Sequence, residues 1–416
     1  MCNILNSYLN ERRIIVTDAA GTTDVIKVSS GVPQGSILGP TLWNILYDEV
    51  FRLKLGHNSH LIGFADDLAL VVTAKTGEIL IREANTALKT ISDWMKTKGL
   101  RLAPEKTEAI MLSGKKKHCP ITFTIEGTVI EPKEEKLKYL GVWLDKSLKF
   151  HKHIEEVARK TERLTTALTQ LMPKMGGPRA SKRRVLASVA HSVMLYGAPV
   201  WGDVMKIAKH RQALSKIQRQ LAIRITGAYK TISLEGSLVI AGLIPIEKLV
   251  EERCRLYKGK EERKTPEEER TRTLTIWSEE WKKKGKGAWT RELIRDLIPW
   301  IERKHGEVDR WITQALSGHG VFNTYLYAIG KAGSEDCPYC GIMDTPEHAI
   351  FECVSFEEER RKAEGDGEKY TKENLINKML ESNVMWRNGW EVLVRRSLRL
   401  FTVKSGMPSG VDHWYP

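Results

Sequence analysis

The sequence predicts an α+β fold, in which short antiparallel strands with packed helices come first and a longer helical part follows. Two periodicities carry this prediction. Up to about residue 145, apolar residues alternate with polar ones or form short runs between turns, which is typical of β-hairpins. From His151 onward they recur at helical spacing. The 416 residues, 41% of them hydrophobic, suffice for two or three domains with substantial cores.

Residues 8–30 are expected to form one hairpin, and the loop Gly31–Pro40 follows it. The loop holds three glycines and two prolines, so its backbone can approach a ligand closely. Pro40 suits the first turn of the next helix. Gln34 lies inside the loop, and its side-chain amide, taken alone, is expected to make a turn hydrogen bond.

The stretch Leu61–Thr73 predicts a second hairpin, because the adjacent acids Asp66 and Asp67 lie between two apolar runs. Hairpin turns favour Asn-Gly or Asp-Gly, so two carboxylates are a poor choice for turn geometry alone. A solvated acidic turn explains the pair. A turn that binds a cation explains it as well, because a cation offsets the repulsion between the carboxylates. The residues alone leave both interpretations open.

An amphipathic helix over residues 80–95, closed by Gly99, should pack beneath the sheet that carries the acids. Lys106 precedes a short β-like run. A solvated lysine is the common case at such a position, and contact with an anion is the alternative. Residues 120–145 then alternate as short strands.

The helical part over residues 146–250 lies in the most basic region of the chain. The net charge is +14, and residues 101–230 hold 26 Lys and Arg against 11 Asp and Glu, whereas the rest holds 40 against 41. Such a concentration favours a surface that neutralises phosphates, although it can also serve solubility. The apolar stripes of these helices are expected to face a core.

Residues 251–272 predict a charged linker at a domain boundary. Fifteen of these 22 residues are charged, 8 basic and 7 acidic, which indicates a solvated helix or linker rather than a phosphate-binding surface. In the following domain, residues 273–416, five tryptophans are expected in the core, with stacking against bases as the alternative. They are Trp277, Trp281, Trp289, Trp300 and Trp311.

Three cysteines and a histidine near the C-terminus predict a structural zinc site. Their spacing is Cys337-x2-Cys340-x7-His348-x4-Cys353, which supplies four ligands suited to tetrahedral zinc. Thr345 would cap the short turn that carries His348. The alternative is a chance cluster of reduced thiols. Six cysteines in a chain of this length do not form a dense disulfide framework.

The sequence has no apolar run of about 18 residues and no N-terminal signal pattern. We therefore expect an intracellular, non-membrane protein.

Five stretches, in order, resemble motifs of the reverse transcriptases of non-LTR (LINE-type) retrotransposons. They are Gly31–Pro40, similar to the palm motif GxPQGSxLGP; Phe64-Ala65-Asp66-Asp67, similar to the catalytic [FY]xDD box; Gly99-Leu100 with Lys106-Thr107, similar to the GL…KT segment; Lys138–Asp145, similar to the KYLGxxxD stretch; and the Cys/His cluster. The resemblance extends to about Arg360. It implies a partial polymerase palm over residues 1–145, a helical thumb over 146–250 and a small zinc-bearing, α-rich C-terminal domain.

The resemblance implies a magnesium-dependent catalytic site. Asp66 would be the main ligand of Mg²⁺ and Asp67 its companion. Two such ions would activate the primer 3′-hydroxyl and stabilise the leaving pyrophosphate. Lys106 would help to neutralise or protonate that pyrophosphate.

The same resemblance implies positions that contact the substrates. Gln34 and Gly35, with Phe64 and Ala65, would line the nucleotide and template pocket. Leu140-Gly141 would belong to the primer grip. The partners implied are an RNA template, a DNA primer or target, and dNTPs, with action in the nucleus; the oligomeric state stays open.

One feature of the family is missing from this sequence. Members have an earlier palm aspartate upstream of the GxPQG motif, and Asp18 and Asp24 do not resemble it. Neither the fingers nor the endonuclease domain of longer members is recognised. We therefore expect an RNA-directed DNA polymerase by descent that is inactive, or nearly so, as this chain alone. The alternative is a non-catalytic nucleic-acid-binding module that uses residues 101–230 and the zinc-bearing tail.

Overall fold

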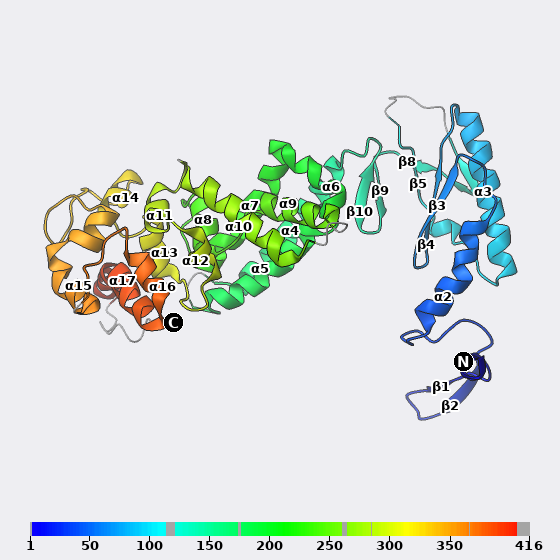
Figure 1. Cartoon of the computed structure of the whole chain (residues 1–416), viewed down its shortest axis with the longest axis horizontal. Coiled ribbons are helices and arrows are strands. Elements are labelled where there is room, and N and C mark those ends of the chain that lie inside the picture. The colour runs from blue at the N-terminus through cyan, green and yellow to red at the C-terminus, as the bar shows by residue number, and fades with distance from the viewer. Residues whose placement is uncertain are drawn as a thin grey trace. The chain divides into compact units, whose positions relative to one another are not determined.

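The structure is a computed structural model that describes residues 2–113, 121–173, 176–259, 264–283, 285–365 and 367–405. The chain divides into two compact units, Met1–Leu137 and Lys138–Pro416. Small two-stranded sheets occur with helices in the first unit, and helices dominate the second (Figure 1). The α+β prediction is confirmed at this level.

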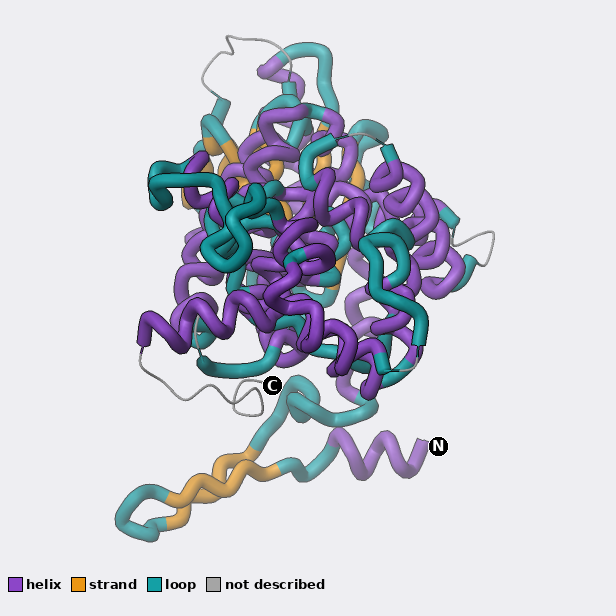
Figure 2. The backbone as a smooth tube through the Cα atoms, turned by 90° about the vertical axis from the view of Figure 1, so that its left-hand side faces the viewer, coloured by secondary structure: helices purple, strands orange, loops and turns teal. Residues whose placement is uncertain are grey.

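The first unit alternates short strands with helices. Its elements are α1 (Cys2–Leu9), β1 (Arg13–Thr17), β2 (Thr23–Lys27), α2 (Gly39–Asp48), the 3-10 turn η1 (Glu49–Arg52), β3 (Ser59–Phe64), β4 (Asp67–Val72), α3 (Gly77–Thr97), the 3-10 turn η2 (Pro104–Lys106), β5 (Ala109–Ile110), β6 (Phe123–Ile125), β7 (Thr128–Ile130) and β8 (Pro132–Lys133). The pairs β1–β2, β3–β4 and β6–β7 are antiparallel, and β5 pairs with β8 in parallel. The β1–β2 hairpin forms a twisted ribbon (Figure 2).

The core of the first unit lies where α2 and α3 meet the β3–β4 hairpin. Tyr47 and Val50 pack with Ile91 and Met95, and Leu68 and Leu70 of β4 pack against them. Side chains alternate between the two faces of a strand. Asp67 therefore lies on the opposite face of β4 from these two leucines.

The second unit is built mainly of helices. Its elements are β10 (Val142–Asp145), α4 (His151–Gln170), α5 (Ala180–Leu195), α6 (Ala198–Trp201), η3 (Gly202–Lys206), α7 (Ala208–Thr226), α8 (Leu234–Ala241), α9 (Ile246–Lys258), α10 (Pro266–Lys282), α11 (Ala288–Leu293), α12 (Leu297–Glu302), α13 (Arg310–Ser317), α14 (Asn323–Ala328), the π-helical turn η4 (His348–Glu352), η5 (Val354–Phe356), α15 (Glu357–Glu364), α16 (Leu375–Glu381) and α17 (Asn383–Ser405). Strand β9 (Lys136–Tyr139), which begins just before this unit, pairs with β10.

One hydrophobic core runs through most of the second unit, with buried members from Leu168 in α4 to Leu398 in α17. Four of the five predicted tryptophans are buried in it, which confirms the core interpretation for them: Trp277, Trp281, Trp300 and Trp311. Trp289 is half-buried, and its indole N–H donates to the carbonyl of Ala315 at 2.7 Å.

The segment for which a linker is predicted, residues 251–272, contributes to α9 and α10, and its residues 260–263 lie outside the described part of the chain. Ion pairs made by residues of this segment join these helices. Arg255 bonds to Glu269 at 2.5 Å, and Arg270 bonds to Glu252 at 2.8 Å. The balanced charges therefore pair between neighbouring helices, and the two compact units divide elsewhere, near Leu137.

Helix α5 leaves two bulky apolar residues outside its buried face. Val185 and Val189 are exposed, whereas Ala187, Ala190 and Met194 are buried. Small alanines allow the neighbouring helices to approach closely, so the bulkier valines are left on the outer face.

Within the described residues, no single helix has the length and apolar composition needed to cross a membrane. Helix α5 and the segment Ala198–Lys206 reach that composition only when taken together, and the chain bends by 48° between them.

Candidate active site and metal centre

The acidic hairpin turns at Ala65 and Asp66, with Phe64 of β3 opposite Asp67 of β4. Ala65 has φ 55°, a conformation that is unfavourable for any residue with a Cβ. Both aspartates are exposed. The turn thus presents two neighbouring carboxylates to solvent. This is compatible with a solvated acidic turn and with a turn that binds a cation.

Helix α2 supports this turn through two aromatic residues. The indole N–H of Trp43 donates to the carbonyl of Ala65 at 3.2 Å. Burial raises the pKa of Tyr47, and the charges of Asp66 and Asp67 raise it further. Trp43 and Tyr47 also stack, with ring centroids 5.1 Å apart. Sequence reasoning did not single out these two residues, although aromatics four apart on the helix after the glycine-rich loop were a visible signal.

The loop that leads into α2 is held by Ser36. The Ser36 hydroxyl donates to the carbonyl of Pro33 at 2.7 Å and accepts the N–H of Gly39 at 3.2 Å. Gln34 is exposed, and its amide makes no hydrogen bond with the described residues, so the expected turn bond is made by Ser36 instead. Gly35 is exposed with φ 84°, and a Cβ there would meet no atom within 4 Å. The side chain of Gln34 and the backbone of Gly35 are therefore open to a ligand.

Lys106 ends the turn η2 and is exposed. It forms no ion pair with the residues that the structure describes. Neither a hydrogen bond nor an ion pair in that part of the chain joins Lys106 to Asp66 or Asp67.

Leu140 and Gly141 form the tight turn between β9 and β10. Both have positive φ, 44° and 82°. The Tyr196 hydroxyl donates to the carbonyl of Leu140 at 2.9 Å. At the end of β10, one carboxylate oxygen of Asp145 accepts the backbone N–H groups of Ser147 and Lys149 at 3.1 and 3.0 Å. Burial opposes ionisation of Asp145, but these hydrogen bonds outweigh it and lower its pKa.

The four predicted zinc ligands come together in the second unit. Their ligand atoms all lie within 4.8 Å of one another. The sulfur of Cys353 lies 3.9 Å from that of Cys337 and 3.8 Å from that of Cys340, and His348 Nε2 lies 3.2 Å from the Cys340 sulfur. Tetrahedral zinc with Zn–S bonds of about 2.3 Å spaces its sulfurs about 3.8 Å apart. The donor set and spacing therefore fit zinc.

Local structure explains how this cluster is shaped. The N–H of Cys337 donates to the carbonyl of Ile342 at 2.7 Å, and Gly341 supplies positive φ for the turn. The Thr345 hydroxyl accepts the N–H of His348 at 3.0 Å, as the sequence predicts. The other ring nitrogen of His348 is buried without a hydrogen bond, 3.9 Å from Glu352.

Among the described residues, the Cys/His cluster is the one group of three or more His, Cys, Asp or Glu side chains close enough to share a metal ion. Asp66 and Asp67 gather no third such ligand there. Magnesium prefers octahedral oxygen ligation, so these two carboxylates supply part of such a site.

Comparison with known proteins agrees with the motifs. Residues 2–144 match the family model described as reverse transcriptase (RNA-dependent DNA polymerase). The chain is 26% identical over 79% of its length to "Retrovirus-related Pol polyprotein from type-1 retrotransposable element R1 2" of Nasonia vitripennis, and spans 86% of that protein. No solved structure matches.

Two longer relatives come from Drosophila melanogaster. The "Putative 115 kDa protein in type-1 retrotransposable element R1DM" is 26% identical over 89% of the chain, and the "RNA-directed DNA polymerase from mobile element jockey" is 25% identical over 58%. The chain spans only 38% and 27% of these two proteins. The resemblance indicated by the motifs is confirmed: residues 2–144 match the reverse transcriptase family, and the similar proteins are Pol proteins and RNA-directed DNA polymerases of retrotransposable and mobile elements.

Proposed function

We propose that this chain is part of an RNA-directed DNA polymerase of a non-LTR retrotransposon, with Asp66 and Asp67 as its metal-binding carboxylates. The observation that carries the proposal is the exposed acidic turn, supported by Trp43 from the helix after the glycine-rich loop, within the residues that match the family. A solvated acidic turn would not require this support. The substrates proposed are an RNA template, a DNA primer or target, and dNTPs, with action in the nucleus.

The proposed mechanism assigns roles to the residues around this turn. Mg²⁺, when bound, supplies Lewis-acid stabilisation for nucleotidyl transfer. Asp66 and Asp67 would hold the metal, and Trp43 fixes the backbone that carries these two residues. Gln34 and Gly35 offer an exposed amide and an open backbone to the nucleotide and template. The ammonium group of Lys106 forms no ion pair within the described part of the chain, which suits contact with pyrophosphate.

We further propose that the 416-residue polypeptide alone is inactive or nearly so, because the described residues bring no third carboxylate to the turn. A primer-extension assay with an RNA template, a DNA primer, dNTPs and Mg²⁺ tests this. A chimera in which this chain replaces the matching part of the Drosophila R1DM relative, of which it spans 38%, forms the second arm.

We expect extension from the chimera and none from the chain alone. Asp66→Ala should abolish extension by the chimera, whereas the exposed Asp93→Ala on α3 should preserve it. Extension by the chain alone that Asp66→Ala abolishes would refute the proposed inactivity. A chimera that folds and binds primer–template without extending it, or whose extension survives Asp66→Ala, would refute the catalytic assignment.

The Cys/His cluster is proposed to hold one structural zinc ion. Metal analysis of the purified chain should find one zinc per chain, lost when Cys337 and Cys340 are both replaced by serine. Cys254→Ser, outside the cluster, is the matched control and should keep the metal. A metal-free chain of equal stability would refute the zinc proposal.

The second candidate function is a non-catalytic nucleic-acid-binding module. The basic segment 101–230 favours it, but part of its charge is used internally, since Arg211 and Arg219 donate to backbone carbonyls. Filter binding to RNA that weakens steeply with salt and is unchanged by Asp66→Ala would support this function. Undetectable binding at low salt would exclude it.

A further inference from the structure

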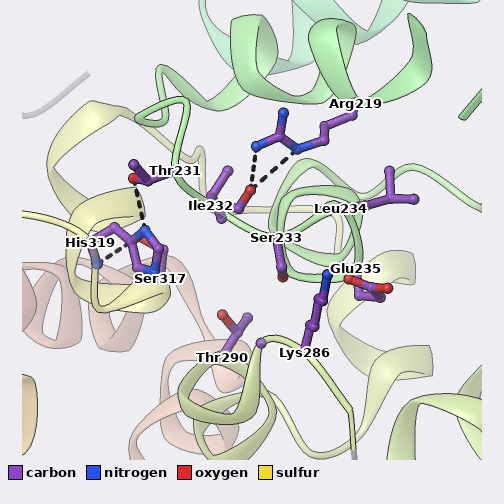
Figure 3. Close-up of a pocket in the computed structure, with 11 residues that line it drawn as sticks. Arg219, Thr231, Ile232, Ser233, Leu234, Glu235, Lys286, Thr290, Ser317 and His319 are labelled. Carbon is purple, nitrogen blue, oxygen red and sulfur yellow. Dashed lines mark hydrogen bonds between the residues drawn. The ribbon is translucent and has the colours of Figure 1, made fainter. Parts of the chain in front are cut away.

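A cavity of about 600 Å³ lies in the second unit, far along the chain from residues 2–144. Three connections meet there: the loop before α8, the turn before α11 and the end of α13 (Figure 3). Most of the side chains around it are polar, including Arg219, Ser233, Glu235, Lys286, Thr290 and His319. Its size suits a ligand such as a single nucleotide.

Thr290 is the first indication that the cavity is built to bind a ligand. The residue is 1% exposed, and its hydroxyl makes no hydrogen bond with the described residues. Figure 3 shows the side chain directed into the cavity. Within the described residues this hydroxyl has no partner, so its hydrogen-bonding capacity is available to a polar ligand.

Two cationic side chains reach the same space. Arg219 donates from Nε and Nη2 to the carbonyl of Ile232, at 3.2 and 2.6 Å, which leaves Nη1 uncommitted within the described part of the chain. Lys286 is exposed, forms no ion pair with described residues, and extends towards Ser233 (Figure 3). Both side chains can donate to phosphate oxygens.

The N-terminus of α8 opens onto the cavity and adds positive potential. Ser233 caps this eight-residue helix by accepting the N–H of Gly236 at 3.0 Å. Unpaired amides at a helix start favour anions. Gly287 faces the cap with φ 77°, and a Cβ there would lie 3.1 Å from the Ser233 hydroxyl. Glycine therefore keeps this wall open.

Two further groups on the cavity wall favour a nucleotide over inorganic phosphate as the ligand. Glu235 is an exposed carboxylate on the cavity wall, and it would repel inorganic phosphate but could accept hydrogen bonds from ribose hydroxyls. The ring of His319 is held by a 2.9 Å hydrogen bond to Thr231 and stacks on Tyr325 at 4.9 Å. A base could stack beside such a ring.

We infer that this cavity binds a nucleoside phosphate, with the phosphate near Arg219, Lys286 and Thr290 and the ribose near Glu235. The ligand is either a free nucleotide or one nucleotide of an RNA strand, and the shared chemistry is a 5′-phosphorylated ribonucleoside. The residues of this cavity belong to the second unit, whereas Asp66 and Asp67 belong to the first.

The test uses the full chain in EDTA, so that magnesium-dependent binding at Asp66 and Asp67 does not contribute. Calorimetry measures binding of 5′-AMP, 5′-dAMP and inorganic phosphate, and fluorescence anisotropy measures binding of a 12-nucleotide RNA. We expect 5′-AMP to bind more tightly than either of the other two small probes. Asp66→Ala should leave all of these affinities unchanged. The binding measured here can therefore fail or succeed independently of the polymerase proposal.

Variants of residues that line the cavity test whether the measured binding occurs there. Lys286→Gln should weaken 5′-AMP binding about 10-fold or more, and Thr290→Val about 3- to 10-fold. Thr290→Ser keeps the hydroxyl and should restore binding. The control is Lys216→Gln, which removes an exposed lysine of α7 that does not line the cavity. Circular dichroism establishes that each variant is folded.

If Lys286→Gln and Thr290→Val weaken RNA binding to the same extent and 5′-AMP competes with RNA, the cavity holds a nucleotide of the strand. If RNA binding is unaffected while 5′-AMP binding is lost, the ligand is a free nucleotide. No detectable binding of 5′-AMP or RNA, or losses no larger than that of Lys216→Gln, would overturn the inference.

Discussion

The hydroxyl of Tyr196, at the end of α5, donates a hydrogen bond of 2.9 Å to the backbone carbonyl of Leu140, in the turn between β9 and β10. The Tyr196 ring also lies against Gly141, where a Cβ would sit 2.7 Å from a ring carbon. The turn that resembles the family's primer grip is thus held by a helix of the following bundle. Its geometry should depend on the absence of a side chain at residue 141.

Gly141→Ala is expected to lower the free energy of unfolding by roughly 2 kcal/mol, because the new Cβ meets the Tyr196 ring and φ is 82°. Urea denaturation measures the loss. Gly127→Ala is the control, since Gly127 has φ 86° and open space around it. If the ring contact matters, Gly141→Ala should cost less in a Tyr196→Ala background; equal costs in both backgrounds would contradict this explanation.

Ala65 should be replaceable by glycine with a gain in stability. Its φ of 55° costs a residue with a Cβ roughly 1 kcal/mol, and glycine avoids that cost. Ala65→Gly should therefore raise the unfolding midpoint slightly, and Ala65→Val should lower it. Thermal unfolding followed by circular dichroism gives the order of the three proteins. A glycine variant less stable than the valine variant would show that the turn is not strained.

Two histidines, the buried His153 and the half-buried His191, should make the second unit less stable in mild acid. Burial lowers the pKa of His153 and of His191 to about 4. Each ring also accepts a hydrogen bond at 3.2 Å, His153 from the N–H of Trp143 and His191 from the amide of Gln218. The unfolded chain, with histidine pKa near 6.5, therefore binds more protons between pH 6.5 and 4.

The free energy of unfolding should therefore fall as the pH decreases from 6.5 to 4, by up to about 1.4 kcal/mol per pH unit for each histidine. Urea denaturation at pH 7.5, 6 and 5 measures the slope. His191→Gln keeps a hydrogen-bonding side chain but removes the titration, so its slope should be shallower. A slope identical to that of the unchanged chain would contradict the role of His191.

The pairing of α9 with α10 should depend on Glu252. This carboxylate is 3% exposed and receives hydrogen bonds from Arg270, from Nε at 2.9 and 3.2 Å and from Nη2 at 2.8 Å. Because Arg270 is half-exposed, Glu252→Ala should cost about 1–3 kcal/mol, less than breaking a fully buried pair. The exposed neighbour Glu251→Ala should change stability by less than about 0.5 kcal/mol. Equal losses would show that the pair adds nothing specific.

Local patterns predicted most of the elements but not their faces. The acidic hairpin was visible because apolar runs flank Asp66 and Asp67, and the Cys/His cluster because its ligands are close in sequence. By contrast, helical spacing did not show that Ile45 and Val185 would be exposed. The spacing identifies a row of apolar residues along a helix. Which face of the helix is buried depends on the elements that pack against it.

Contacts between distant segments were beyond prediction. The cavity that contains Thr290 combines residues from Arg219 to His319, and no local motif marks such a meeting of loops. The ion pairs made by the segment 251–272 were beyond prediction for the same reason, because balanced charges describe a solvated helix or linker as well as two helices joined by ion pairs. Whether Lys106 meets the acids in catalysis stays a prediction.

The two-stranded sheets have a consequence for handling the protein. Every strand of the described residues has a single partner, so the other edge of each strand carries backbone donors and acceptors that no strand covers. In the β1–β2 ribbon these edges accompany exposed apolar side chains, among them Ile15 and Val25. A strand of another chain can pair with such an edge. The first unit should therefore determine the concentration at which the protein begins to self-associate.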